Sequence, residues 1–365
     1  MSAHEILIWI MAVFAAIGAL DRIFGNRLGL GQEFENGILA MGSLALAMVG
    51  IITLAPVLAE LLRPFVVPVY RFLGADPAMF AGTILACDMG GAALAEALTE
   101  DPQAALLGGL IGGSMLGATV VFTIPVALGI LEEGDRPFLA KGILAGIVTV
   151  PLGIFAGGLV AGFPVGMILS NLVPILLIAL LIALGLWKAE KAMIRGFAVF
   201  GKGILAVITF GLAVAVIQAL TGVTLIPGTV DISEGFLTVG MIAIVLAGAF
   251  PLVFTVTKLL RKPLMRMGSR LGINDTAAAG LIASLANSIA TFGMVKDMDD
   301  RGKVVNIAFA VSAAFVFGDH LGFAAGFAPS MLPAVIAGKL VGGVSAAAVA
   351  MLLTRKETGK RENYG

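Results

Sequence analysis

The chain has 365 residues, of which 59% are hydrophobic and only 13% carry a charge. An ordinary soluble domain has about 25% charged residues, so this chain cannot cover a water-facing surface, and lipid is its expected solvent. The net charge is zero, which gives no indication of a nucleic-acid partner. The single cysteine, Cys87, excludes an intrachain disulfide and a multi-thiolate metal site. The composition predicts an all-α polytopic membrane protein.

Runs of apolar residues long enough to span a bilayer, roughly 18 residues or more, recur along the whole chain. They lie near 5–21, 36–62, 104–131, 138–163, 166–187, 199–222, 235–257, 303–325 and 331–353. The first run lacks a basic n-region and a small-residue cleavage site, so it is predicted to be a retained span. Two weaker segments, 78–99 and 276–296, are interrupted by small and polar residues.

The sequence also repeats itself. Ser114 matches Ser312 and Lys141 matches Lys339 at the same offset of 198 residues. Duplicated apolar units are typical of transporters built from two structural repeats. The predicted organisation is transmembrane repeat 1 (1–165), a linking helix and cytoplasmic loop (166–198), transmembrane repeat 2 (199–353) and a cytoplasmic tail (354–365).

The basic residues select between two topologies. If segments 78–99 and 276–296 dip into the membrane and return, all but four of the 23 Lys and Arg residues fall on one side. The positive-inside rule makes that side the cytoplasm. The favoured fold is therefore two five-element inverted repeats with re-entrant hairpins plus a linking helix, giving nine crossings and two hairpins. If both segments cross instead, there are eleven crossings and the repeats are parallel.

The polar residues of the two interrupted segments are the first candidates for a site, because charges at membrane depth usually face a cavity or a partner. Asp88 lies in Ala-Cys-Asp-Met-Gly-Gly, and its carboxylate suits a small ammonium ion, although it could simply cap the following half-helix. Asn287 and Ser288 occupy the matching place in the second segment and suit a hydroxyl. Their alternative role is interhelical hydrogen bonding.

Further candidates come from the run at 303–325. Asp319 and His320 lie late in it, and adjacent side chains on a helix point about 100° apart, so both can border one cavity. Imidazole titrates near neutral pH and could carry protons. An ion pair at the membrane interface is the alternative. Ser312 is a secondary substrate-binding candidate, and Lys339 is predicted to be an anchoring residue that snorkels to the interface.

Long stretches around these residues resemble the ethanolamine permease family of bacterial ethanolamine-utilisation operons. They include Ala40–Gly50, Met79–Gly91, Ile124–Ile130 and Ala310–Ala325. The resemblance implies uptake of ethanolamine across the bacterial cytoplasmic (inner) membrane by a multi-pass protein that is not an enzyme.

The residue chemistry agrees with that substrate, which carries one ammonium and one hydroxyl group. Asp88 or Asp319 would pair with the ammonium, and Asn287 or a serine would bind the hydroxyl. Alternating access, with an elevator-type motion on a homodimeric scaffold, is the expected mechanism. No cofactor is expected, and the expected partners are ethanolamine and membrane lipid.

The sequence leaves two other functional classes open. One is an intramembrane acid–base enzyme using two aspartates; Val316 stands where the Gly-x-Gly-Asp motif of intramembrane aspartyl proteases needs its first glycine. The other is a transporter or channel for a different small cation.

Overall fold

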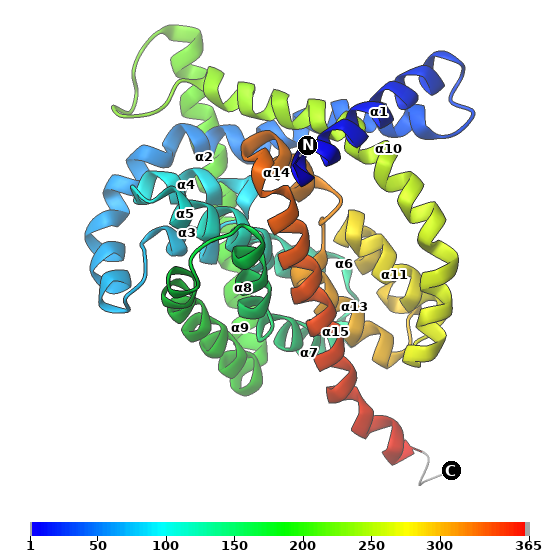
Figure 1. Ribbon diagram of the computed structural model, residues 1–365. Coiled ribbons are helices and arrows are strands. Elements are labelled where there is room, and N and C mark those ends of the chain that lie inside the picture. Colours follow the sequence, from blue (N-terminus) through cyan, green and yellow to red (C-terminus); the bar gives the residue numbers. More distant parts are fainter. Residues whose placement is uncertain (1, 362–365) are drawn as a thin grey trace.

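The computed structural model describes the backbone of residues 2–361, and the side chains of this range except residues 3, 260–270 and 356–361. All regular structure within these residues is helical (Figure 1). In chain order the elements are α1 (Ala3–Ile23), α2 (Leu30–Phe72), α3 (Ala78–Ile84), η1 (Cys87–Met89), α4 (Gly91–Leu98), α5 (Pro102–Ala105), η2 (Leu106–Gly117), η3 (Thr119–Thr123), α6 (Ile124–Ile130), η4 (Glu133–Asp135), α7 (Arg136–Ile147), α8 (Val150–Val160), α9 (Val165–Thr221), α10 (Ile232–Leu271), α11 (Asp275–Ala286), α12 (Ser288–Met294), η5 (Val295–Asp297), α13 (Asp300–Ala313), α14 (Asp319–Phe327), η6 (Pro329–Met331) and α15 (Leu332–Arg361).

Seven helices within the described residues are long and apolar enough to cross a membrane, in agreement with a polytopic all-α protein. One of them, α9, contains both predicted runs 166–187 and 199–222, joined across a kink at Ala189. The linking segment after the run 166–187, predicted to end in a cytoplasmic loop, is helical except at Ala189, and α10 continues past the predicted run 235–257 as far as Leu271. Lys and Arg are good helix formers, so charged stretches need not end a helix.

The run predicted as one span at 303–325 is broken. Helix α13 ends at Ala313, α14 begins at Asp319, and Phe315 between them has a left-handed φ of 62°. The Phe315 amide donates to the Ser284 carbonyl at 3.0 Å, and the Phe317 amide donates to the Leu285 carbonyl at 2.9 Å. The end of α11 thus satisfies backbone groups that the break releases, as buried amides require.

The two weaker segments are each split into two short helices, and the two ends of each segment lie together. In the first, hairpin 1 (residues 76–99), the Thr99 hydroxyl donates to the Asp76 carboxylate at 2.8 Å. In the second, hairpin 2 (residues 274–299), the Asn274 amide donates to the Asp299 carboxylate at 2.7 Å. Each segment therefore leaves and returns to the same neighbourhood.

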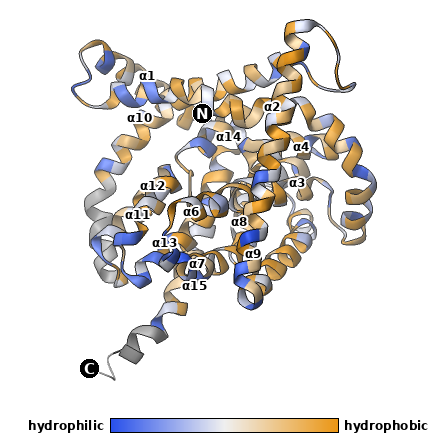
Figure 2. Cartoon of the chain, turned by 180° about the vertical axis from the view of Figure 1, so that it is seen from behind, coloured by the Kyte–Doolittle hydropathy of each residue, from blue (hydrophilic) through white to orange (hydrophobic). Residues whose placement is uncertain are grey.

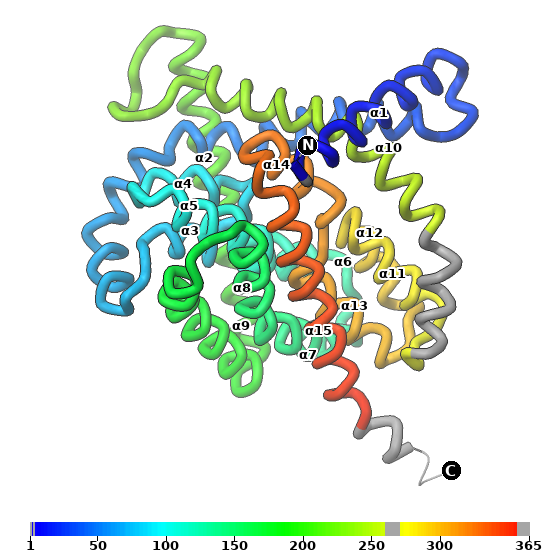
Figure 3. The backbone as a smooth tube through the Cα atoms, in the orientation of Figure 1, coloured from blue at the N-terminus to red at the C-terminus, as the bar shows by residue number. Residues whose placement is uncertain are grey.

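The π-helical element η2 lies at the centre of the molecule. Its Leu107, Leu110, Ile111 and Met115 have no exposed surface. It packs against α3 and α4 of hairpin 1 and against α8, and α15 crosses beside α7, α8 and α13 (Figure 3). Apolar residues also cover much of the outside of the bundle, and hydrophilic ones gather at helix ends and loops (Figure 2). An apolar exterior of this kind suits a lipid environment.

Candidate functional site

The bend of hairpin 1 presents Asp88 to the centre of the molecule. Leu85 and Ala86 are extended after α3, and η1 carries Cys87 and Asp88. Gly90 then adopts φ of 91°, a left-handed conformation that suits glycine, and its missing Cβ leaves room for Ile51. The short helices on either side of the bend are thus joined by irregular backbone, with the carboxylate at the turn.

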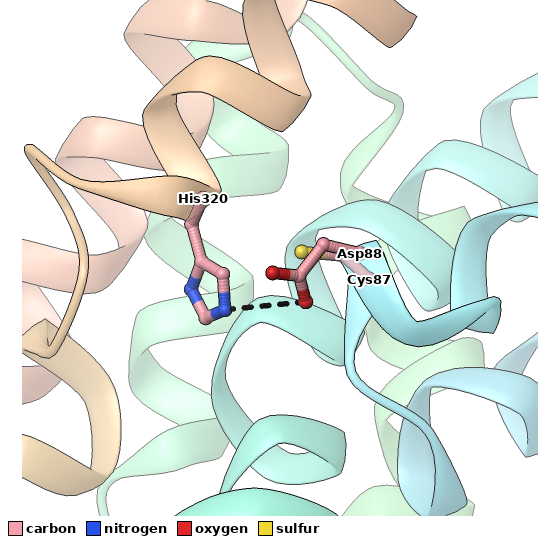
Figure 4. A group of neighbouring side chains, drawn as sticks. All are labelled: Cys87, Asp88 and His320. Carbon is pink, nitrogen blue, oxygen red and sulfur yellow. Dashed lines mark ion pairs between the residues drawn. The ribbon is translucent and has the colours of Figure 1, made fainter. Parts of the chain in front are cut away.

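Asp88 faces His320, the second residue of α14 (Figure 4). The Nε2 atom of His320 lies 3.6 Å from Oδ1 of Asp88, and the exposed fractions of the two side chains are 4% and 14%. His320 is predicted to lie late in a continuous helix, but it lies at the start of α14, because the chain breaks and changes direction after Ala313. His320 and Asp319 line the same cavity.

The other ring nitrogen of His320 contacts Lys339 of α15. Nζ of Lys339 lies 3.0 Å from Nδ1 of His320 and 2.5 Å from the carbonyl oxygen of Ser114 in η2. An ammonium only donates hydrogen bonds, so with Lys339 charged, Nδ1 accepts and the imidazole proton lies on Nε2, toward Asp88. Lys339, His320 and Asp88 thus form a row of three side chains, which we call the central triad.

The anchoring role predicted for Lys339 is wrong. Only 1% of this residue is exposed, although it stands about two turns into its helix, where snorkelling could be expected. Lys339 lies on the face of α15 that packs against η2. Lys141, the matching residue in the first half, is exposed, so the two lysines have different environments.

A cavity of about 520 Å³ borders the central triad. Asp88, Asp319 and His320 line it together with the aromatic rings of Phe122 and Phe315. The two phenylalanine rings meet edge to face at a centroid separation of 5.6 Å, and Phe315 lies 5.3 Å from the His320 ring. The wall therefore combines carboxylates with aromatic faces, both of which attract an organic cation.

Asp319 also lines a second cavity, of about 550 Å³, with Asn287, Glu33 and Lys258. Asn287 is exposed at the bend of hairpin 2, where its side-chain oxygen accepts the Ile289 amide at 2.8 Å and caps α12. The structure therefore brings Asp319 near both groups of predicted residues, whereas Asn287 and Asp88 belong to different cavities.

The predicted serines lie elsewhere. Ser288 and Ser312 are fully buried, and their hydroxyl oxygens have no hydrogen-bond partner within the described residues. Neither lines the two cavities. Ser284 is held by Thr291 at 2.8 Å, so it serves the packing of hairpin 2.

Cys87, Asp88 and His320 each place a donor atom within 4.8 Å of the others, a separation that a metal ion could bridge. The Lys339 amine contacts the same imidazole, and its positive charge opposes the entry of a divalent cation.

Three residues of this site were not predicted: Lys339, Phe122 and Phe315. The match between Lys141 and Lys339 was visible in the sequence, but it gave no indication that one of the pair is buried. The phenylalanines had no signal, since 22 phenylalanines are spread along the chain.

Comparison with known proteins identifies the family. The model of "Ethanolamine utilisation protein, EutH" matches residues 3–353. A "Probable ethanolamine permease EutH" of Listeria monocytogenes serotype 1/2a (strain 10403S) is 60% identical, covering 99% of this chain and 97% of the relative. A protein with the same name from Salmonella typhimurium (strain LT2) is 50% identical, with 98% and 97% covered. "Uncharacterized protein YxeR" of Bacillus subtilis (strain 168) is also 50% identical, with 99% and 98% covered.

No solved structure matches the chain. The family match extends over nearly the whole sequence and includes all of hairpin 1, α14 and Lys339. With its seven long apolar helices in the described residues, the chain is a multi-pass protein of the bacterial inner membrane and belongs to the ethanolamine utilisation protein EutH family.

Proposed function

We propose that this protein carries ethanolamine into the cell and that Asp88 binds the substrate's ammonium group. The observation that carries the proposal is a nearly buried carboxylate, Asp88, at the edge of a cavity about 520 Å³ in volume. A buried carboxylate is costly unless a cation or hydrogen-bond donors balance it. Relatives named as ethanolamine permeases support this substrate.

The cavity walls suit a small protonated amino alcohol. Phe122 and Phe315 offer ring faces and edges beside the carboxylate, and cation–π attraction adds to the charge interaction where water is scarce. Asp319 borders the same cavity and is a second substrate contact. We leave Asn287, Ser288 and Ser312 out of the ligand set, because none of them lines this cavity.

A carrier is favoured over the two alternatives. The relatives are named permeases, which gives an intramembrane acid–base enzyme no support. A site that a small organic cation fills, surrounded by broken helices, is typical of transporters.

The transport mechanism that we propose is alternating access by two inverted repeats. In this account hairpins 1 and 2 are re-entrant, and a homodimer provides the scaffold for an elevator-type movement. The hydrogen bonds that join the two ends of each hairpin, Thr99 to Asp76 and Asn274 to Asp299, support re-entry. Irregular backbone at membrane depth is tolerated where protein or a water-filled cavity surrounds it.

The topology can be tested by cysteine labelling from outside intact cells, in a background with Cys87 replaced by alanine. Cysteines at the exposed positions 71 and 103, which flank hairpin 1, should react with an impermeant reagent. Cysteines at the exposed positions 275 and 296 in hairpin 2 should stay protected, because inverted repeats open the hairpins to opposite sides. Labelling of only one member of either pair would replace re-entry with a crossing.

The substrate role of Asp88 can be tested with labelled ethanolamine and proteoliposomes. Asp88→Asn keeps the size of the side chain but removes the charge, so we expect saturable uptake to be lost. Asp231→Asn is the matched control, because Asp231 is exposed and caps α10, and asparagine caps a helix as well as aspartate does. Wild-type uptake by folded Asp88→Asn protein would refute the role.

A further inference from the structure

The central triad poses a problem of charge. Lys339, His320 and Asp88 come from α15, α14 and hairpin 1, and their side chains are nearly or fully buried. With Lys339 as an ammonium, Asp88 as a carboxylate and His320 neutral, the empty triad has no net charge. Entry of a protonated amine beside Asp88 adds one positive charge to a region that solvent does not screen.

We propose that Lys339 balances this charge by giving up a proton, so that the protein exchanges one ethanolammonium ion for one proton. This inference rests on the proposed function. Lys339 is then the resident cation of the empty carrier, and the substrate's ammonium replaces its charge in the loaded one. Each state carries a single positive charge opposite Asp88.

His320 provides the route for the proton. Its Nδ1 atom contacts Lys339 at 3.0 Å, its Nε2 atom faces Asp88, and its ring lines the cavity. Lys339 passes a proton from Nζ to Nδ1, and the proton on Nε2 leaves to water in the cavity. Lys339 becomes a neutral amine, His320 stays neutral with its other nitrogen protonated, and one proton reaches solvent for each cation bound.

The other titratable groups around the triad have different surroundings. Asp319 is half-buried, opens onto both cavities and interacts with the charge of Asp88. Its own charge is the same in the empty and the loaded states, so in the proposed exchange Lys339 balances the positive charge that enters. Lys202 of α9 is exposed at the cavity edge. Cys87 borders a third cavity that also contains Glu96 and Glu234. Lys339 is the buried cation in direct contact with the imidazole.

The first test uses the unmodified protein. Purified protein in a weakly buffered detergent solution with a pH indicator is mixed with ethanolamine that has been adjusted to the same pH. We expect about one proton to be released for each ethanolamine bound, because the site keeps a constant charge. Binding without proton release would overturn the exchange and would mean that Asp319 balances the substrate. A failure to bind would instead count against the proposed function.

The second test separates exchange from a structural role. Wild-type uptake should be electroneutral and therefore unchanged by a potassium diffusion potential across the proteoliposome membrane. An inside-acidic gradient of one pH unit should drive accumulation toward about tenfold by exchange. This should be faster than in protein-free vesicles, where diffusion of the free base approaches the same limit. Wild-type uptake driven by the potential would contradict the proposal.

Substitution of Lys339 should change electroneutral exchange into uptake of the cation that the membrane potential drives. In Lys339→Met we expect no proton release, and an inside-negative potential of about 100 mV should support accumulation of up to about 50-fold. Lys141→Met, at the matching exposed position of the first half, should keep the wild-type behaviour. If Lys339→Met does not fold, the two measurements on the wild-type protein still decide the question.

Discussion

Hairpins 1 and 2 have the same plan, two short helices joined by a bend with both ends together, but they hold opposite kinds of bend. The bend of hairpin 1 is buried, and Asp88 in it faces a histidine. The bend of hairpin 2 carries the neutral Asn287, which is exposed and caps its own helix. The first bend needs other elements to satisfy its charge, whereas the second satisfies its polar group locally.

The means of holding the hairpins also differ. Hairpin 1 is packed so closely on η2 that a Cβ at Gly82 would meet the Gly108 carbonyl, and one at Gly117 would meet the Leu85 carbonyl. Hairpin 2 also meets backbone, because a Cβ at Gly318 would run into the Ala286 carbonyl, but it adds side-chain hydrogen bonds from Thr291 to the Gly280 carbonyl and from Asn306 to the Ala277 carbonyl. Close backbone packing fixes the position of the charged bend, and polar side chains add to the packing of the neutral one.

The largest effect on stability is expected where backbone meets backbone. In Gly82→Ala the new methyl group runs into the Gly108 carbonyl, which cannot move aside as a flexible side chain would. Overpacking of this kind costs about 1–3 kcal/mol, and more where backbone must shift. Thermal unfolding of the purified protein in detergent should show a clear loss, together with weaker uptake because Asp88 is displaced.

Gly293→Ala in hairpin 2 is the matched control. A Cβ there meets no atom within 4 Å, and alanine favours a helix over glycine by roughly 1 kcal/mol. We expect an unchanged or slightly raised melting temperature. Equal losses in the two variants would mean that the hairpins are packed alike, and the contrast between them would fail.

Much of the architecture was within reach of the sequence. The apolar runs predicted the membrane helices, and the small and polar residues at 78–99 and 276–296 predicted two interrupted segments, because such residues allow irregular backbone. The continuity of α9 and α10 through charged stretches was missed, since charge ends a membrane span without ending a helix. The break after Ala313 was also missed, because its backbone is satisfied by α11, which is distant in sequence.

The residues of the site also divide into those that the sequence predicts and those that depend on packing. Asp88, Asp319 and His320 were found because charged or titratable groups in apolar segments are rare and costly. Lys339 was misread, because its depth in the helix allows either snorkelling or burial, and only the packing of α15 against η2 decides between them. Asn287 was predicted from its place in the repeat, but a position in a bend does not reveal whether the side chain is needed for a cap.

The smallest expected effect is at the bend of hairpin 2. Asn287→Ala removes the cap on α12 and should lower stability by about 1 kcal/mol, while Asn287→Ser should keep most of it. The KM for ethanolamine should be unchanged in both variants, because Asn287 does not line the cavity beside Asp88. If the Asn287 amide instead held the substrate's hydroxyl, Asn287→Ala would raise the KM for ethanolamine by up to about tenfold. Uptake of ethylamine, which lacks the hydroxyl, would then be unaffected, so comparing the two amines distinguishes a helix cap from a ligand.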